Sequence, residues 1–268
     1  MTPGEGAKSS PGGRTAPMVM RRTCEKIGAP LRNQPQRKLH ECLATAGDTE
    51  MYTFKTLEIT GYGNRKVSNT FFRQQEETRR LAIVLPGVGY TCQMPLLYYA
   101  SHAATGLGMD ALWVEYDYIR RPEYNALPAA EKIQWLLTDV ETAMRIGLAQ
   151  RSYDAITLIG KSLGTVAISR LVSTDSRLAS SRIVWLTPVL SDDKVRAQIK
   201  TRKKDLIVLG TADHYYDRAY MAELIAANNN EVLLVKGADH SMEIQGNVSE
   251  SVAILGKVTG SILTFLSG

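Results

Sequence analysis

Short apolar runs separated by helical segments fill the chain from about residue 80 onward. Six such runs lie at 81–87, 111–117, 155–160, 182–188, 206–210 and 231–237. Their apolar character is continuous rather than alternating, which is typical of strands covered on both faces. The pattern therefore predicts six buried strands.

The segments between these runs have the periodicity of helices that cover a sheet. Apolar residues recur at helical spacing from Ile133 to Leu148 and again from Val252 to Phe265. Another helix is expected at 95–106, where Pro95 suits a first helical turn and Gly106 suits a stop. Alternating strands and helices predict a three-layer α/β fold with a mostly parallel sheet and right-handed crossovers.

The stretch before these runs has a different pattern. Residues 52–60 and 66–73 are rich in aromatic and β-branched residues, and they flank the sequence GYGN. This arrangement predicts two strands joined by a turn. A hairpin would then open the domain and bring the central sheet to about eight strands.

The first fifty residues show neither helical nor strand periodicity. They hold half of the ten prolines, together with stretches such as PGEGAKSSPGG. We predict a flexible or weakly ordered tail at 1–50, followed by a single folded domain at 51–268. Composition leaves open whether the tail is a targeting segment, binds a partner or is an extension without a role.

Composition and charge narrow the class of protein. The 268 residues, 44% of them hydrophobic, can bury one sizeable core. The net charge is +5, but 32 Lys and Arg are largely matched by 27 Asp and Glu, which disfavours a nucleic-acid partner. The tail holds eight basic and five acidic residues, so the rest of the chain is nearly balanced.

Cysteine content and hydropathy favour a protein of the cytoplasm. The three cysteines, Cys24, Cys42 and Cys92, are too few and too scattered for a disulfide framework or a CxxC metal site. No apolar run near the start suggests a signal peptide, and no stretch of about 18 apolar residues suggests a bilayer span. We expect a soluble cytoplasmic protein without a membrane partner, of an oligomeric state that the sequence leaves open.

The run at 155–160 leads into a motif with chemical meaning. It ends at Gly160 and continues as Lys161, Ser162, Leu163 and Gly164, a G-x-S-x-G pattern that opens a helical segment. A strand that turns into a helix over one residue strains that residue, and glycines two positions away let the backbones pass. Such a turn projects the serine hydroxyl beside the positive end of the helix. We predict that Ser162 is a nucleophile.

A serine hydroxyl needs a base to take its proton and usually a carboxylate to hold that base. His240 is the best candidate base among four histidines, because it comes just after the run at 231–237. Asp213 follows the run at 206–210 in the same way and is the candidate carboxylate. The other histidines are His40 in the tail, His102 in the helix at 95–106, and His214.

Three further acids compete with Asp213 for this role: Asp217, Asp239 and Glu243. Asp217 suits the start of the next helix. Asp239 is adjacent to His240 in sequence, which generally aims the two side chains apart. Asp213 therefore remains the preferred acid.

The chain order Ser162, Asp213, His240, each placed beyond a strand, resembles the α/β-hydrolase superfamily over about residues 52–267. The resemblance implies an α/β-hydrolase fold with an oxyanion hole. Its expected donors are the backbone amides of Leu163 and Val88.

The second donor would come from the sequence VLPGVGYT, which stands where the family has its glycine-containing oxyanion loop. Here Pro86-Gly87 replaces the family's usual His-Gly. Tyr90 is the alternative to Val88 for this role.

The resemblance implies a serine hydrolase that cleaves small carboxylic esters or thioesters through an acyl-enzyme on Ser162. The connections at 118–128 and 189–204 are too short for a cap domain, so we expect an open site. The sequence contains no HExxH, Walker A or GxGxxG motif, so we expect neither a cofactor nor a metal. Two alternatives remain: an acyltransferase or peptidase with the same triad, and a non-catalytic binding protein with the same fold.

Overall fold

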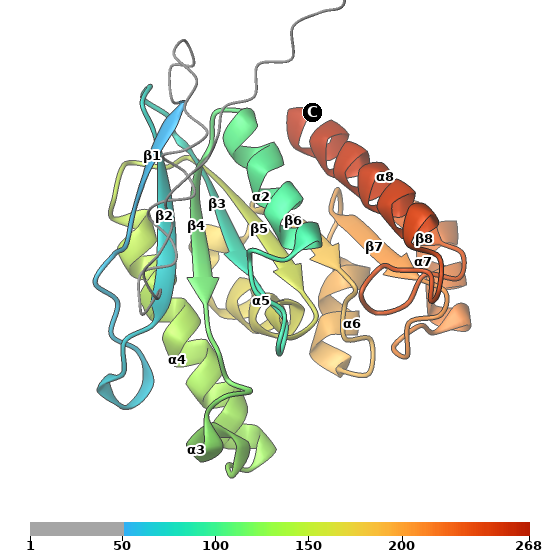
Figure 1. The fold of residues 1–268 in the computed structure, drawn as a ribbon, viewed down its shortest axis with the longest axis horizontal. Coiled ribbons are helices and arrows are strands. Elements are labelled where there is room, and N and C mark those ends of the chain that lie inside the picture. The colour runs from blue at the N-terminus through green and yellow to red at the C-terminus, as the bar shows by residue number, and fades with distance from the viewer. Residues whose placement is uncertain (1–50) are drawn as a thin grey trace, which may run out of the picture. The chain divides into compact units, whose positions relative to one another are not determined.

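The computed structural model describes residues 51–268, so the predicted tail at 1–50 lies outside the described residues. A central eight-stranded sheet carries helices on both faces (Figure 1). The strands are β1 (Tyr52–Lys55), β2 (Ser68–Gln74), β3 (Arg80–Leu85), β4 (Asp110–Glu115), β5 (Ala155–Lys161), β6 (Arg182–Leu186), β7 (Leu206–Gly210) and β8 (Glu231–Val235). This architecture confirms the predicted α/β fold class.

The helices fall between the strands, as the periodicity predicts. They are α2 (Pro95–Gly106), α3 (Pro122–Asn125), α4 (Ala129–Leu148), α5 (Leu163–Thr174), α6 (Asp193–Thr201), α7 (Arg218–Ala227) and α8 (Val248–Ser267). Two 3-10 turns, η1 (Tyr62–Asn64) and η2 (Ser176–Leu178), complete the described elements. The helix expected at 95–106 has the predicted bounds.

The strands lie in the order β1-β2-β4-β3-β5-β6-β7-β8. β2 pairs antiparallel with β1 and with β4, whereas every pair from β4 to β8 is parallel. The parallel strands therefore end at one edge of the sheet, the lower edge in Figure 1. Loops that leave β3, β5, β7 and β8 meet at this edge, where ligands bind in open α/β sheets.

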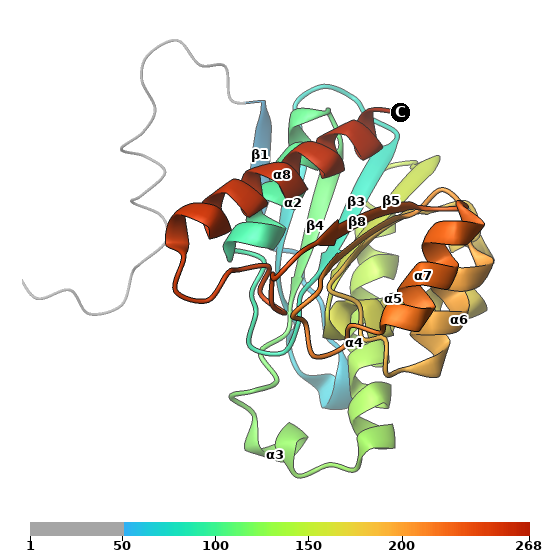
Figure 2. The ribbon, with the colours of Figure 1, turned by 90° about the vertical axis from the view of Figure 1, so that its right-hand side faces the viewer.

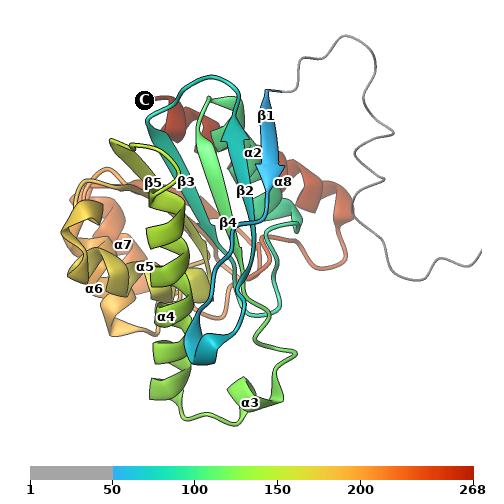
Figure 3. The same ribbon diagram turned by 90° about the vertical axis from the view of Figure 1, so that its left-hand side faces the viewer.

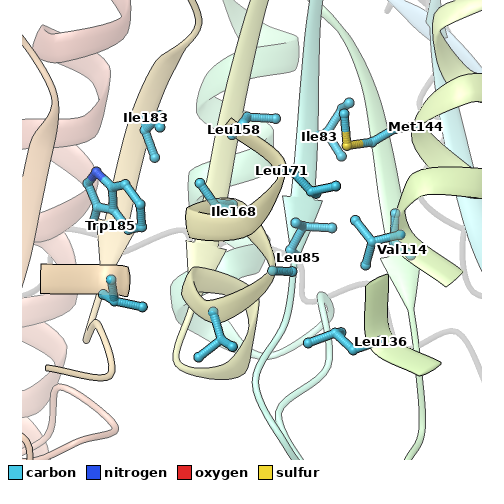
Figure 4. Packing of buried hydrophobic residues seen from close by; sticks show 14 of the residues in the cluster. Ile83, Leu85, Val114, Leu136, Met144, Leu158, Ile168, Leu171, Ile183 and Trp185 are labelled. Carbon is cyan, nitrogen blue, oxygen red and sulfur yellow. The ribbon is translucent and has the colours of Figure 1, made fainter. Parts of the chain in front are cut away.

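Helices α2 and α8 cover one face of the sheet, and α4, α5, α6 and α7 cover the other (Figures 2 and 3). Alternate residues of one strand enter different cores. In β3, Ile83 and Leu85 pack with α4 and α5 in the cluster of Figure 4, while Val84 packs toward α2 and α8. Burial on both faces explains why the apolar runs of the sequence are continuous.

The hairpin at the start of the domain differs from its prediction. β1 ends at Lys55 instead of continuing to residue 60. The Asn69 side chain accepts a hydrogen bond from the Leu57 amide at 2.9 Å and donates one to the Leu57 carbonyl at 2.8 Å. Leu57 therefore satisfies its backbone without a strand partner, which the alternation of residue types does not reveal.

Helix α8 qualifies the expectation that no segment could span a bilayer. Within residues 51–268, α8 is the helix whose length and apolar composition would allow it to cross a membrane. Such composition is weak evidence, because core helices pass the same test. Val258, Ile262 and Phe265 are buried against the sheet, whereas Val248 and Val252 are exposed.

Candidate active site

Ser162 lies at the turn from β5 into α5 and has a strained backbone. Its φ of 49° and ψ of −113° lie outside the regions that serine normally adopts. A side chain on Gly164 would bring its Cβ to 2.1 Å from the Leu85 carbonyl oxygen, and one on Gly160 would meet Gly164 at 3.0 Å. The two glycines let α5 pack directly on β3, which fixes the position of the serine.

A chain of two hydrogen bonds connects Ser162 with two loops from other strands. The Ser162 hydroxyl lies 2.9 Å from Nε2 of His240, and Nδ1 of the same ring lies 2.8 Å from Oδ2 of Asp213. An ionised carboxylate only accepts, so the ring proton sits on Nδ1 and Nε2 accepts from the hydroxyl. The structure thus brings together the three residues that the sequence selects.

The environment of Asp213 makes it a fixed acceptor. Its side chain is fully buried, and the second oxygen, Oδ1, accepts the Tyr215 amide at 2.8 Å. His240 is partly exposed. A carboxylate held by two donors orients the imidazole ring and stabilises a positive charge on it.

The competing acids have other partners. Asp217 caps α7 by accepting the Tyr220 amide at 3.0 Å, and it also accepts a hydrogen bond from Arg196. Asp239 accepts the Ser241 amide at 2.8 Å. Within residues 51–268, Asp213 alone pairs with His240.

The other described histidines lie outside this hydrogen-bonded chain. His102 sits on α2 among the rings of Tyr98, Phe72 and Trp113. His214 lies beside the chain, with its ring centroid 4.7 Å from that of His240. His40 lies outside the described residues.

The loop after β3 lies against the serine. A Cβ on Gly87 would lie 3.0 Å from Cβ of Ser162. Gly87 to Tyr90 form a tight turn in which Gly89 has a φ of 67° and the Tyr90 amide faces the Gly87 carbonyl at 3.4 Å. The Val88 amide donates to no backbone carbonyl of the described residues.

The amides of the two expected oxyanion donors, Leu163 and Val88, are free to bind a ligand, unlike the amide of the alternative, Tyr90. Leu163 is the first residue of α5, where a backbone amide has no acceptor within its own helix. The Val88 amide is likewise available, whereas the Tyr90 amide already faces a carbonyl within its own turn. These contacts favour Val88 over Tyr90 as the second donor.

Lys161, between Gly160 and Ser162, has a position that sequence reasoning missed. It is 2% exposed, and its Nζ donates to the His240 carbonyl at 2.9 Å and to Oγ1 of Thr187 at 3.2 Å. Nζ also lies 4.5 Å from the ring centroid of Tyr90. One ammonium thus contacts the loops after β3, β6 and β8. A lysine that ends an otherwise apolar run was the available signal.

Burial shifts the pKa values of Lys161 and of the neighbouring Tyr90. It lowers the pKa of Lys161 to about 8, against the raising effect of the Asp213 and Asp239 charges. Burial also raises the pKa of Tyr90 to about 12, and the phenol oxygen accepts the Leu96 amide at 3.0 Å. Tyr90 is therefore a neutral wall of the site at neutral pH.

Cys92 is the only cysteine among the described residues, and it lies close to this edge of the sheet. It is fully buried, and its thiol lies 3.7 Å from the Val84 carbonyl. Burial raises the pKa of this thiol well above its usual value. Because the thiolate is the reactive form of cysteine, Cys92 is a poor candidate for a nucleophile.

The edge that carries Ser162 faces solvent. Val88, in the loop after β3, is 54% exposed, and the His214 side chain, in the loop after β7, is 62% exposed. Two depressions elsewhere contain no triad residue: one is lined by residues 74–78, the other by 179–182 and 202–204. Both are lined by residues at the opposite edge of the sheet, where the parallel strands begin. Neither depression therefore contains the candidate catalytic residues.

No family model matches the sequence, and no curated protein matches it. Solved structures are similar. A serine hydrolase of Xanthomonas campestris described as lacking a lid has a TM-score of 0.57 at 13% identity, over 82% of this chain and 95% of its own. An esterase of Pyrococcus furiosus gives 0.57 at 15% identity, over 81% and 92%.

A third similar structure is a putative α/β hydrolase of Agrobacterium tumefaciens. Its TM-score is 0.63 at 14% identity, over 80% of this chain and 95% of its own. At identities this low, the similarity is evidence for a shared fold and not for a shared activity. With its strand order and its serine at the turn from β5 into α5, the chain has the α/β-hydrolase fold that the sequence resemblance predicts.

Proposed function

We propose that this protein is a serine hydrolase that cleaves small carboxylic esters or thioesters. The observation that carries the proposal is the hydrogen-bonded chain from Ser162 through His240 to Asp213, with distances of 2.9 and 2.8 Å. The similar structures include proteins described as serine hydrolases and esterases. Their descriptions agree with the chemistry of the site.

The proposed reaction proceeds through an acyl-enzyme. His240 takes the hydroxyl proton through Nε2 as Oγ of Ser162 attacks the ester carbonyl carbon. The carbonyl oxygen becomes an oxyanion, which the amides of Leu163 and Val88 bind. The intermediate then expels the alcohol or thiol, which leaves with the proton from His240.

Water completes the reaction in the second half. His240 removes a proton from water, the hydroxide attacks the acyl carbonyl, and Oγ of Ser162 leaves with the proton returned by Nε2. Asp213 keeps its negative charge throughout, and it stabilises the imidazolium in both halves. An acyltransferase would differ only in the acceptor that replaces water.

Substrate size follows from what surrounds the site. The connection from β4 to α4 holds only the four-residue helix α3, and the connection from β6 to β7 holds only α6. Neither segment adds a domain above Ser162. A site open to solvent binds a small acyl group, and it offers little apolar area for a long chain.

A panel of p-nitrophenyl esters of increasing acyl length tests this proposal. We expect acetate and butyrate esters to have a kcat/KM at least about tenfold higher than a palmitate ester, because only short chains are covered by the site. Turnover is measured by nitrophenol release below the solubility limit of each ester. Folded protein that hydrolyses none of them would contradict the hydrolase, and a preference for palmitate would contradict the open site.

Val88→Pro tests the second oxyanion donor. Val88 is the second residue of a turn whose third residue, Gly89, has a positive φ, and this turn type accepts proline at its second position. The change therefore removes the amide hydrogen and preserves the turn. We expect kcat to fall by about 10² to 10³ with little change in KM.

Val88→Ala is the matched control for this substitution, because it shortens the side chain and keeps the amide. We expect its kcat to stay within about threefold of the wild-type value. Thermal unfolding of both variants shows whether the loop is intact. Full activity in folded Val88→Pro would reassign the second donor to Tyr90.

A further inference from the structure

His214 lies beside the triad with no place in the proposed reaction. Its side chain is 62% exposed, and its Nδ1 lies 3.8 Å from Oδ1 of Asp213. One ring nitrogen of His214, one of His240 and a carboxylate oxygen of Asp213 all lie within 4.8 Å of one another. Three groups of this chemistry, from the loops after β7 and β8, therefore lie close together.

We propose that Asp213, His214 and His240 bind a divalent transition-metal ion, Zn²⁺ in particular, and that the bound ion reversibly inhibits the enzyme. The inhibition, though not the binding, rests on the proposed function. Two imidazoles and a carboxylate are a ligand set that Zn²⁺ takes in proteins, with water in the fourth position. The sequence analysis predicts no metal, so this proposal departs from it.

The distances suit a small ion. Metal–nitrogen and metal–oxygen bonds of about 2.1 Å place tetrahedral ligand atoms about 3.4 Å apart. Nδ1 of His214 is 3.8 Å from Oδ1 of Asp213, and Nδ1 of His240 is 2.8 Å from Oδ2. One ligand atom from each residue lies within 4.8 Å of the others, so shifts of up to about 1.5 Å produce the tetrahedral spacing. The exposed His214 ring can make this adjustment, because solvent surrounds most of it.

Binding at this point changes the tautomer of His240. Nδ1 is the ring nitrogen that faces Asp213, so an ion shared with Asp213 takes the Nδ1 lone pair. The ring proton then resides on Nε2, and the imidazole remains neutral. In this form Nε2 donates to Oγ of Ser162 and cannot accept its proton. The ion thereby removes the base without entering the oxyanion site.

The charged groups around the site set the strength of binding. Asp213 contributes one negative charge, and Asp239 lies in the loop that carries His240. The Lys161 ammonium faces the His240 carbonyl rather than the ring, and its charge opposes a second cation. We therefore expect moderate affinity and reversible inhibition rather than a permanent metal centre.

The test measures inhibition and binding in the full chain. Protein freed of metal with EDTA is titrated with ZnCl₂ while hydrolysis of p-nitrophenyl acetate is followed, and isothermal titration calorimetry measures binding directly. We expect wild-type activity to fall on titration and to return with excess EDTA. His214→Gln should keep basal turnover within about threefold and raise the inhibitory Zn²⁺ concentration at least about thirtyfold, as expected for loss of one of three protein ligands.

Two controls separate this site from other ligands of the chain. His102→Gln removes a histidine remote from the triad and should leave the inhibitory concentration unchanged. Calorimetry with the inactive Ser162→Ala variant should still show the His214-dependent site, because it measures binding without any need for activity. Equal inhibition of wild type and His214→Gln would overturn the proposal, as would no His214-dependent binding. A protein that binds Zn²⁺ here but hydrolyses no ester would contradict the proposed function alone.

Discussion

Ser162→Ala is expected to lower turnover of p-nitrophenyl acetate by at least about 10⁴-fold and to abolish labelling by a fluorophosphonate probe. The change removes the only atom that forms the acyl bond. It keeps the backbone contact from the Ser162 amide to the Leu186 carbonyl at 3.1 Å, so the fold should persist. Intact-mass spectrometry after probe treatment measures the labelling, and thermal unfolding confirms that the variant is folded.

Ser241→Ala is the matched control, because Ser241 is an exposed serine next to His240 in the sequence. This variant should react with the probe at the wild-type rate. Labelling of folded Ser162→Ala at another serine would move the nucleophile elsewhere. Residual turnover near the wild-type level without labelling would exclude the acyl-enzyme.

Asp213→Asn is expected to lower kcat by about 10⁴-fold while the protein stays folded. Oδ1 accepts the Tyr215 amide, so an asparagine that keeps this bond must turn its NH₂ group toward His240. That group donates to Nδ1, which places the ring proton on Nε2. His240 then faces Ser162 with a donor instead of an acceptor and cannot take the hydroxyl proton.

Asp217→Asn provides the comparison for this variant. Asp217 caps α7 and pairs with Arg196, so its change should cost some stability and leave kcat within about threefold. Steady-state kinetics on both variants decides the assignment. If Asp217→Asn lost turnover while Asp213→Asn kept most of it, the acid of the triad would be Asp217.

Sequence patterns predict most of this fold because the parallel strands are buried on both faces. Runs such as 206–210 coincide with a strand, and the helix at 95–106 has the predicted bounds. The first strand was predicted too long, since Asn69 replaces its ladder with side-chain hydrogen bonds. The residue types around position 57 do not indicate that a side chain twelve residues away bonds this backbone.

The candidate triad could be selected from sequence because each member directly follows a strand of a parallel sheet. The contacts of Lys161 and His214 could not, since they depend on which loops meet across the sheet edge. Lys161 reaches the loop after β8, some eighty positions along the chain. The choice between Val88 and Tyr90 likewise needed the turn geometry, which local residue types leave open.

The buried Lys161 ammonium also has a consequence for alkaline solution. Its pKa is about 8 in the folded protein, whereas a lysine in an unfolded chain titrates near 10.4. Between these values the unfolded chain binds more protons, so the contribution of Lys161 to the free energy of unfolding rises with pH. Over the same range the ammonium loses the charge that attracts the Asp213 and Asp239 carboxylates. Raising the pH thus relieves the cost of burying the Lys161 charge, while it weakens the attraction of Lys161 to the carboxylates in the loops after β7 and β8.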